Sequence, residues 1–121
     1  MSIFSTIFGK DDSKKKEPSL IDQIFSSTSL LEQKSEMLND SWAEQKGRIK
    51  EISAEMRLFT DSNEIAAAKF EQDILGKLTA VSTACDGAIS GKQNAKITLD
   101  RQLNELVTSV HSRTSIEKRK A

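Results

Sequence analysis

Apolar side chains in the first half of the chain recur at alternating spacings of three and four residues. The positions that follow this rule, which we call the seam, are Ile21, Ile24, Thr28, Leu31, Ser35, Leu38, Trp42, Gln45, Ile49, Ile52, Met56 and Phe59. A repeat of 3.5 residues keeps an apolar stripe facing a second, supercoiled helix. The seam therefore predicts one helix over about residues 19–59 that packs against another helix.

Residues with helix-capping side chains stand at both ends of this pattern. Ser19 precedes the first apolar residues and Asp22 follows it by three, which is an acidic form of the helix-start signature. Gly47 costs a helix about 1 kcal/mol relative to Ala, but the seam keeps its phase across it. Residues 60–64 gather capping residues, with Asp61 three before Glu64, and so predict a tight turn.

The second half of the chain predicts two further helices, over about 62–86 and 91–118. In the first, the residues expected to face inward are Ile65, Ile74, Leu78, Val81 and Cys85, and in the second they are Leu99, Leu103, Leu106 and Val110. Gly87 and Gly91 loosen the segment between them, and Ser90 with Gln93 can cap the last helix. One continuous helix over 62–118 is the alternative; we favour the break.

These patterns predict an all-α fold, either a long antiparallel helical hairpin or an elongated three-helix bundle with coiled-coil heptads, over residues 19–118. Strand signals are missing, since the chain has no Tyr and no alternating apolar run. A chain of 121 residues holds one small domain. A thin hairpin buries little surface per residue, so we expect a homo-oligomer or a helical protein partner to cover the seam.

Residues 1–18 form an arm before this body. Residues 10–18 have no large apolar side chain and end at the only proline, Pro18, as a linker does. Before them, the spacing of four apolar residues fits one side of a short helix that can lie in a membrane interface; these are Ile3, Phe4, Ile7 and Phe8. Nearby lysines would favour an anionic membrane surface. A terminus that packs on the body, or does nothing, is the alternative.

The other end of the chain is basic. Residues 92–121 carry a net charge of +4, and the cations expected on this surface are Arg113, Lys118, Arg119 and Lys120, the last two within a basic tail over 119–121. Cations complement the dipole at a helix C-terminus. No aromatic residue accompanies them for base stacking, so contact with nucleic acid is the weaker interpretation.

Candidate chemistry is sparse, and we expect no enzyme, no catalytic residue, no cofactor and no metal. His111 is the only histidine and Cys85 the only cysteine, which is too few for a zinc site within the chain. Cys85 lies on the inward stripe and Trp42 on the seam, so both are interpreted as core. Residues 87–92 (GAISGK) lack the glycine spacing and the hydroxyl residue of a phosphate-binding loop.

The longest apolar run, residues 65–68, is far shorter than a membrane-spanning helix. No secretory signal opens the chain, and a single cysteine suits a reducing compartment. We therefore expect a cytoplasmic protein, peripheral to the inner face of a membrane if its arm binds lipid.

The Met-Ser-Ile-Phe start, the linker ending at Pro18, the long heptad helix and the turn into residues 63–68 (NEIAAA) resemble the phage-shock-protein and ESCRT-III membrane-remodelling superfamily. The resemblance covers residues 1–85. It implies an N-terminal amphipathic anchor on a helical hairpin that assembles on membranes. This chain is shorter, and its hairpin is acidic.

The leading hypothesis is a non-enzymatic coiled-coil scaffold or adaptor, held at a membrane by its N-terminus. A soluble helical chaperone or secretion-associated protein that binds a partner helix is the alternative. A nucleic-acid accessory protein is the third.

Overall fold

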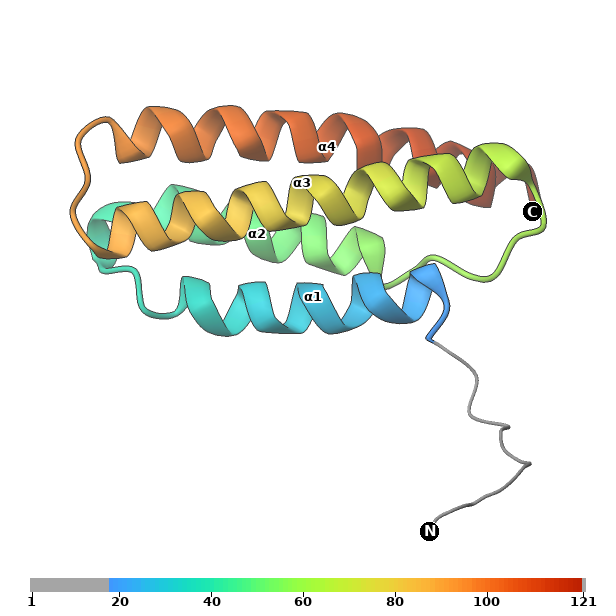
Figure 1. Ribbon diagram of the computed structural model, residues 1–121, viewed down its shortest axis with the longest axis horizontal. Helices are drawn as coiled ribbons and strands as arrows, with labels where there is room; N and C mark the ends of the chain where they lie inside the picture. Colours follow the sequence, from blue (N-terminus) through green and yellow to red (C-terminus); the bar gives the residue numbers. More distant parts are fainter. Residues whose placement is uncertain (1–17, 121) are drawn as a thin grey trace, which may run out of the picture.

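The computed structural model describes residues 18–120, and within them the fold is all-α, as predicted (Figure 1). The helices are α1 (Leu20–Ser35), the short 3-10 helix η1 (Asp40–Trp42), α2 (Ala43–Met56), α3 (Ile65–Ile89) and α4 (Ala95–Lys120). The body is a bundle of four helices packed against one another, which agrees with the predicted all-α bundle or hairpin and has one helix more than the predicted three-helix bundle. The predicted basic tail continues α4 as far as Lys120.

The helix predicted over 19–59 is wrong in one respect, because it is folded back on itself between α1 and α2. The start at Ser19 is confirmed: its Oγ accepts the Asp22 N–H at 3.0 Å, and Asp22 completes a capping box. The helix ends after Ser35, and Asn39 in extended conformation caps η1. Folding back lets the seam of α1 pack against the seam of α2 within one chain.

The predicted break in the second half is confirmed, with different boundaries. Gly87 lies inside α3, and Gly91, with φ of +80°, ends it. The N–H of Lys92 donates to the Gly87 carbonyl at 2.9 Å and the N–H of Gly91 to the Ala88 carbonyl at 3.2 Å, which is the Schellman arrangement. The helix predicted from 91, with Ser90 as its cap, begins instead at Ala95.

The start of α3 also differs from expectation. Glu64 is its N-cap and makes no side-chain capping bond. Ile65, expected to face inward, is 76% exposed. The inward stripe of α3 runs instead through Ala67 and Glu71 to Ile74, again in steps of four and three. Ile65 falls two residues before that stripe and therefore faces outward.

The four helices form two antiparallel hairpins, α1 with α2 and α3 with α4, packed side by side (Figure 1). Helix α1 packs on α2 and α3, and α4 packs on α2 and α3, so α1 and α4 lie diagonally opposite each other, as do α2 and α3. The connection from α2 to α3, residues 57–64, must therefore cross one end of the bundle. The turns at 36–39 and 90–94 lie at the other end.

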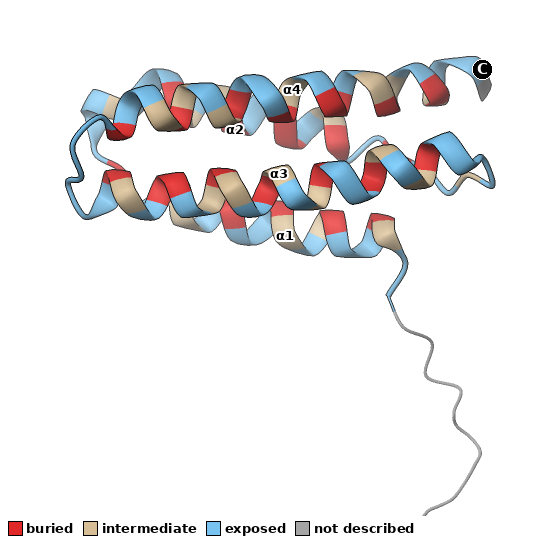
Figure 2. Ribbon diagram, turned by 45° about the horizontal axis from the view of Figure 1, so that its top comes forward, coloured by how far each residue is buried: buried red, intermediate tan, exposed pale blue. Residues whose placement is uncertain are grey.

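The seam forms the α1 and α2 side of the core, and the inward stripes of α3 and α4 form the other side. The buried residues face the space between the hairpins (Figure 2). All the seam residues are buried except Trp42, which is half-buried and packs against the core. The seam is therefore covered by helices of its own chain, and an uncovered stripe no longer argues for a second chain. Homo-oligomerisation and a helical partner stay predictions.

Candidate functional site: the arm end of the bundle

Three segments lie at the end of the bundle where α1 begins. They are residues 18–20 at the start of α1, the loop 57–64, and residues 113–120 at the end of α4 (Figure 1). We call this the arm end, and the opposite end, with the turns at 36–39 and 90–94, the hinge end. Because α1 begins here, the chain enters the body at this end.

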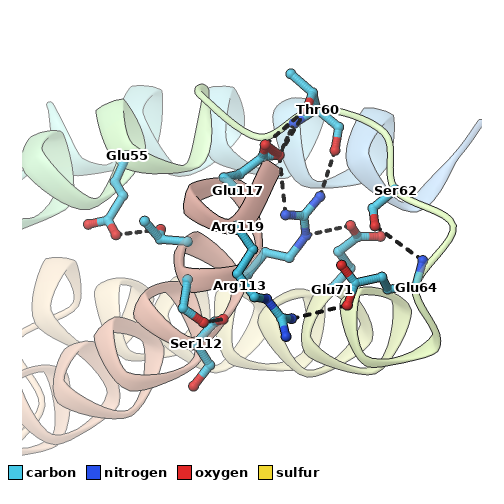
Figure 3. Close-up of polar contacts among 11 residues, drawn as sticks. Glu55, Thr60, Ser62, Glu64, Glu71, Ser112, Arg113, Glu117 and Arg119 are labelled. Atoms are coloured by element: carbon cyan, nitrogen blue, oxygen red, sulfur yellow. Dashed lines mark hydrogen bonds and ion pairs between the residues drawn. The ribbon is translucent and has the colours of Figure 1, made fainter. Parts of the chain in front are cut away.

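A buried arginine organises the arm end. Arg113 has no exposed surface, and its Nε donates to Oε2 of Glu71 at 2.7 Å (Figure 3). Its Nη2 donates to the backbone carbonyl of Thr60 at 2.6 Å, and its Nη1 lies 3.2 Å from Oε1 of Glu117. The guanidinium carbon lies 4.9 Å from the centre of the Phe59 ring. One side chain therefore joins α3, α4 and the crossing loop.

The prediction that Arg113 belongs to an exposed basic tail is wrong. Arg113 continues the inward stripe of α4, three residues after Val110, and Glu71 occupies the matching stripe of α3. Because α3 and α4 are antiparallel, a residue near the start of one meets a residue near the end of the other. The sequence already places Arg113 and Glu71, which have opposite charges, on the inward stripes of their helices. Because charged residues are expected at the surface, the spacing alone did not suggest that they are buried.

Glu117 fixes the loop from its other side. Its carboxylate accepts the backbone N–H of Thr60, and the Thr60 hydroxyl lies 2.9 and 3.0 Å from its two oxygens (Figure 3). At the end of the loop, Oε1 of Glu64 pairs with Nη2 of Arg119 at 3.0 Å. The loop is therefore held at several points along its length.

Two exposed apolar side chains lie here, Leu58 within the loop and Ile65 at the start of α3. Leu58 is 74% exposed and Ile65 is 76% exposed, the highest values among the large apolar residues that the structure describes. Phe59, next to Leu58, is buried under Arg113. The network thus anchors one apolar residue of the loop in the core while its neighbour faces solvent.

Of the remaining predicted site residues near the two ends of the chain, the structure describes the side chains of Lys118 and Arg119. Lys118 is exposed, and Arg119 is largely exposed although paired with Glu64. The side chain of Lys120 lies outside the described part of the chain. So do the membrane-contact candidates Ile3, Phe4, Ile7 and Phe8.

The interpretation of Cys85 as a core residue is confirmed, because its side chain is fully buried. Burial raises the pKa of the thiol to about 11, and this outweighs the opposing effect of the Lys34 ammonium. A thiol in this state is a poor nucleophile at neutral pH. His111 is on the surface, with Nε2 3.4 Å from Oε1 of Glu55.

Trp42 belongs to the hinge end. Its ring is half-buried against the core, and Nζ of Lys96 lies 5.0 Å from the ring centre. The same ammonium donates to the backbone carbonyl of Ser41 at 3.0 Å. Trp42 therefore joins η1 to the start of α4.

Two of the grooves between the helices border α3. One, of about 180 Å³, lies between α1 and α3, where Leu30, Leu31 and Leu78 line it with small hydroxyl residues. The other, of about 380 Å³, lies between α3 and α4 and is lined mostly by small residues, with Lys92 at its edge. Neither of these two grooves gathers an acid, a base and a nucleophile. A third groove, of about 470 Å³ between α2 and α4, is lined by Glu55, His111, Thr114, Ser115 and Lys118.

Comparisons with known proteins add no identity: no family model matches the chain, and neither does a curated protein or a solved structure. Among the described residues, no helix is both long and apolar enough to cross a membrane. Within the same residues, no group of three or more His, Cys, Asp or Glu side chains is placed to hold a metal ion.

Proposed function

We propose that this protein is a non-enzymatic helical scaffold or adaptor, peripheral to a membrane, that contacts an anionic lipid surface through its arm end. The observation that carries the proposal is the placement of Leu58 and Ile65, two highly exposed apolar side chains, at the end where the arm joins the body. Exposed apolar residues next to cations are typical of surfaces that dock at a membrane interface.

The arm and the arm end complement each other in this proposal. Burial of one large apolar side chain contributes roughly 1.5 to 3 kcal/mol, while ordering each backbone residue of the arm costs about 1 to 2 kcal/mol. The arm alone therefore binds weakly. Leu58 belongs to a loop already held by Arg113 and Glu117, and Ile65 belongs to the first turn of α3, so both add apolar contact at little further entropic cost.

Electrostatic attraction is modest at this surface. Lys118 and Arg119 add positive charge, and each cation near an anionic surface contributes about 1 kcal/mol. Glu64, which pairs with Arg119, offsets part of this contribution. We therefore expect reversible binding that strengthens with anionic lipid and weakens with salt.

Vesicle flotation tests this function. The intact protein should float with anionic vesicles at low salt, and two double variants should float far less: Ile3→Asp with Phe4→Asp in the arm, and Leu58→Asp with Ile65→Asp in the arm end. Met37→Asp is the matched control, because Met37 is 72% exposed but lies at the hinge end. Its flotation should equal that of the unchanged protein.

Failure of the intact protein to float at low salt would overturn the membrane role. The soluble partner-binding protein would then be the better account, and the groove beside Leu30, which is 65% exposed, favours it as the second candidate. We do not propose the nucleic-acid role, because Arg113 is buried, which removes one of the cations on which it depended.

A further inference from the structure

The turn between α1 and α2 preserves the phase of the seam. Ser35, Leu38, Trp42 and Gln45 continue the spacing of three, four and three across it. A hairpin does not require this, since its turn sets the relative rotation of the two helices whatever their phase. A continuous helix does require it, because only then does one stripe run along one face.

No residue of the turn forces the bend. Residues 36–42 contain neither glycine nor proline. Glu36 has helical φ and ψ of −65° and −18°, and Asn39 is extended at −82° and −177°. The backbone is therefore still helical at Glu36 and has left the helical region at Asn39, and both residues are of types that a helix accepts.

Polar contacts at the surface hold the bend instead. Oδ1 of Asn39 accepts the backbone N–H of Ser41 at 3.0 Å and its hydroxyl at 2.6 Å. Lys46 donates to the Leu38 carbonyl at 2.9 Å, and Lys96 donates to the Ser41 carbonyl at 3.0 Å. Water can replace each of these contacts if the turn becomes helical, so the bend and the straight helix differ little in polar bonding.

The contacts of α1 with the rest of the body can all be remade by a second copy. Helix α1 packs only on α2 and α3. Its polar links are few: Arg57 to Glu32 at 2.6 Å and Lys34 to Asp86 at 3.0 Å are the ion pairs. If α1 and α2 straighten into one helix, two such helices related by a two-fold axis run antiparallel, as α1 and α2 already do.

We propose that this chain has a second, domain-swapped form, in which residues 36–42 are helical and α1 of each copy packs on α2 and α3 of its partner. The partner is a second copy of this chain, and the surface that receives it is the seam. The contacts of α1 with α2 and α3 recur between the copies, and those of α4 with α2 and α3 stay within each copy, so the two forms differ mainly at the turn.

Two variants at the turn should move this equilibrium in opposite directions. Asp40 is the first residue of η1 and follows the extended Asn39, which is the setting in which proline is tolerated. Asp40→Pro therefore fits the bend. Inside a straight helix proline is unfavourable, so the variant should lower the equilibrium constant for straightening each chain by about a hundredfold. Asn39→Ala removes the cap of η1 and should raise the same equilibrium constant by about fivefold for each chain.

Ser19→Ala is the matched control. It also removes a helix cap, at the start of α1, where both forms have the same structure. The full chain and each variant are unfolded, refolded at about millimolar concentration, diluted, and examined by sedimentation velocity. Circular dichroism melting shows that each variant is folded.

We expect the unchanged protein to contain a fraction of dimer. Compared with that fraction, the dimer should be more abundant in Asn39→Ala, equally abundant in Ser19→Ala and absent in Asp40→Pro. Absence of dimer in both the unchanged protein and Asn39→Ala would overturn it. So would a dimer that forms equally well in folded Asp40→Pro, because that dimer would not use the turn.

A distance measurement separates a swapped dimer from two monomers that touch. Spin labels at Ser26→Cys and Ala54→Cys, both at exposed positions of α1 and α2, should lie within about 25 Å in the hairpin, whose helix axes are about 10 Å apart. In a straight helix the same positions are about 42 Å apart. The dimer, assembled with excess unlabelled chain, should show the long distance, and the short distance there would overturn the proposal.

Discussion

At the scale of single residues, Arg113 can lie in the core because its hydrogen-bond donors have acceptors. Glu71, Glu117 and the Thr60 carbonyl each accept a hydrogen bond from a different nitrogen of the guanidinium group. The Phe59 ring packs against the same group. A buried charge is tolerated only when it is paired and hydrogen-bonded. Arg113 therefore specifies the position of the loop more than it adds stability, since an apolar residue could fill the same volume.

This account predicts unequal effects of single and double replacements. Arg113→Met leaves Glu71 buried without its partner and should lower the free energy of unfolding by about 3 to 5 kcal/mol. Adding Glu71→Leu removes the unpaired carboxylate and should recover most of that loss. Urea unfolding of the two variants checks this; equal stability of the single and the double variant would contradict the role given to the pair.

Cys85 predicts slow thiol chemistry. With its pKa raised to about 11 from 9.0, the thiolate fraction at pH 7 is about a hundredfold below that of a free thiol, and burial blocks access as well. Because the shift is upward, the labelling rate should still rise with pH above pH 9, where a free thiol levels off. Labelling by a thiol reagent, with and without denaturant, measures this. Rapid labelling of the native protein at pH 7 would show that Cys85 is not in the core.

At the scale of helices, spacing predicts which residues are buried better than it predicts where helices end. The seam identifies the buried face of α1 and α2 because burial follows the stripe. The bend at residues 36–39 escapes prediction because the seam keeps its phase there and no glycine or proline marks it. Gly91 marks the other bend, since the Schellman turn needs positive φ.

The site was predicted less well than the fold, for a related reason. Arg113 lies at an inward position, but its charge suggested the surface, and its partner Glu71 is distant in sequence. The exposure of Leu58 and Ile65 depends on how the loop crosses the end of the bundle, and local pattern does not determine that path. The arm candidates Ile3, Phe4, Ile7 and Phe8 lie outside the described residues and stay a prediction.

Two glycines in contrasting settings test the helix boundaries. Gly47 is inside α2, with open space around the position of a Cβ atom, whereas Gly91 has φ of +80°. Gly47→Ala should stabilise the protein by about 1 kcal/mol, which raises Tm by about 4 to 8 °C for a domain of this size. Gly91→Ala should lower Tm, because a Cβ atom strains the left-handed conformation. Thermal unfolding followed by circular dichroism decides both, and a Tm shift of the same sign in the two variants would contradict these boundaries.

At the scale of the whole molecule, the two ends of the bundle have different roles in this account. The arm end carries the arm, the exposed Leu58 and Ile65, and the cations at the end of α4. Arg113 fixes the loop that contains Leu58. The hinge end carries two turns, one of them held by replaceable polar contacts. Binding to a surface therefore uses the arm end, whereas exchange with a second copy straightens the turn at the hinge end and carries α1, with the arm before it, to the partner copy.

Hydrogen–deuterium exchange of the intact protein, with and without anionic vesicles, tests the membrane role most directly, since it reports on each end separately. The account predicts that vesicles slow exchange in residues 1–10 and in the loop 57–64, and leave residues 36–42 and 90–94 unchanged. Neutral vesicles should give a smaller effect in the same segments. Unchanged exchange at the arm end, or equal slowing at both ends of the bundle, would contradict the claim that this end meets the membrane.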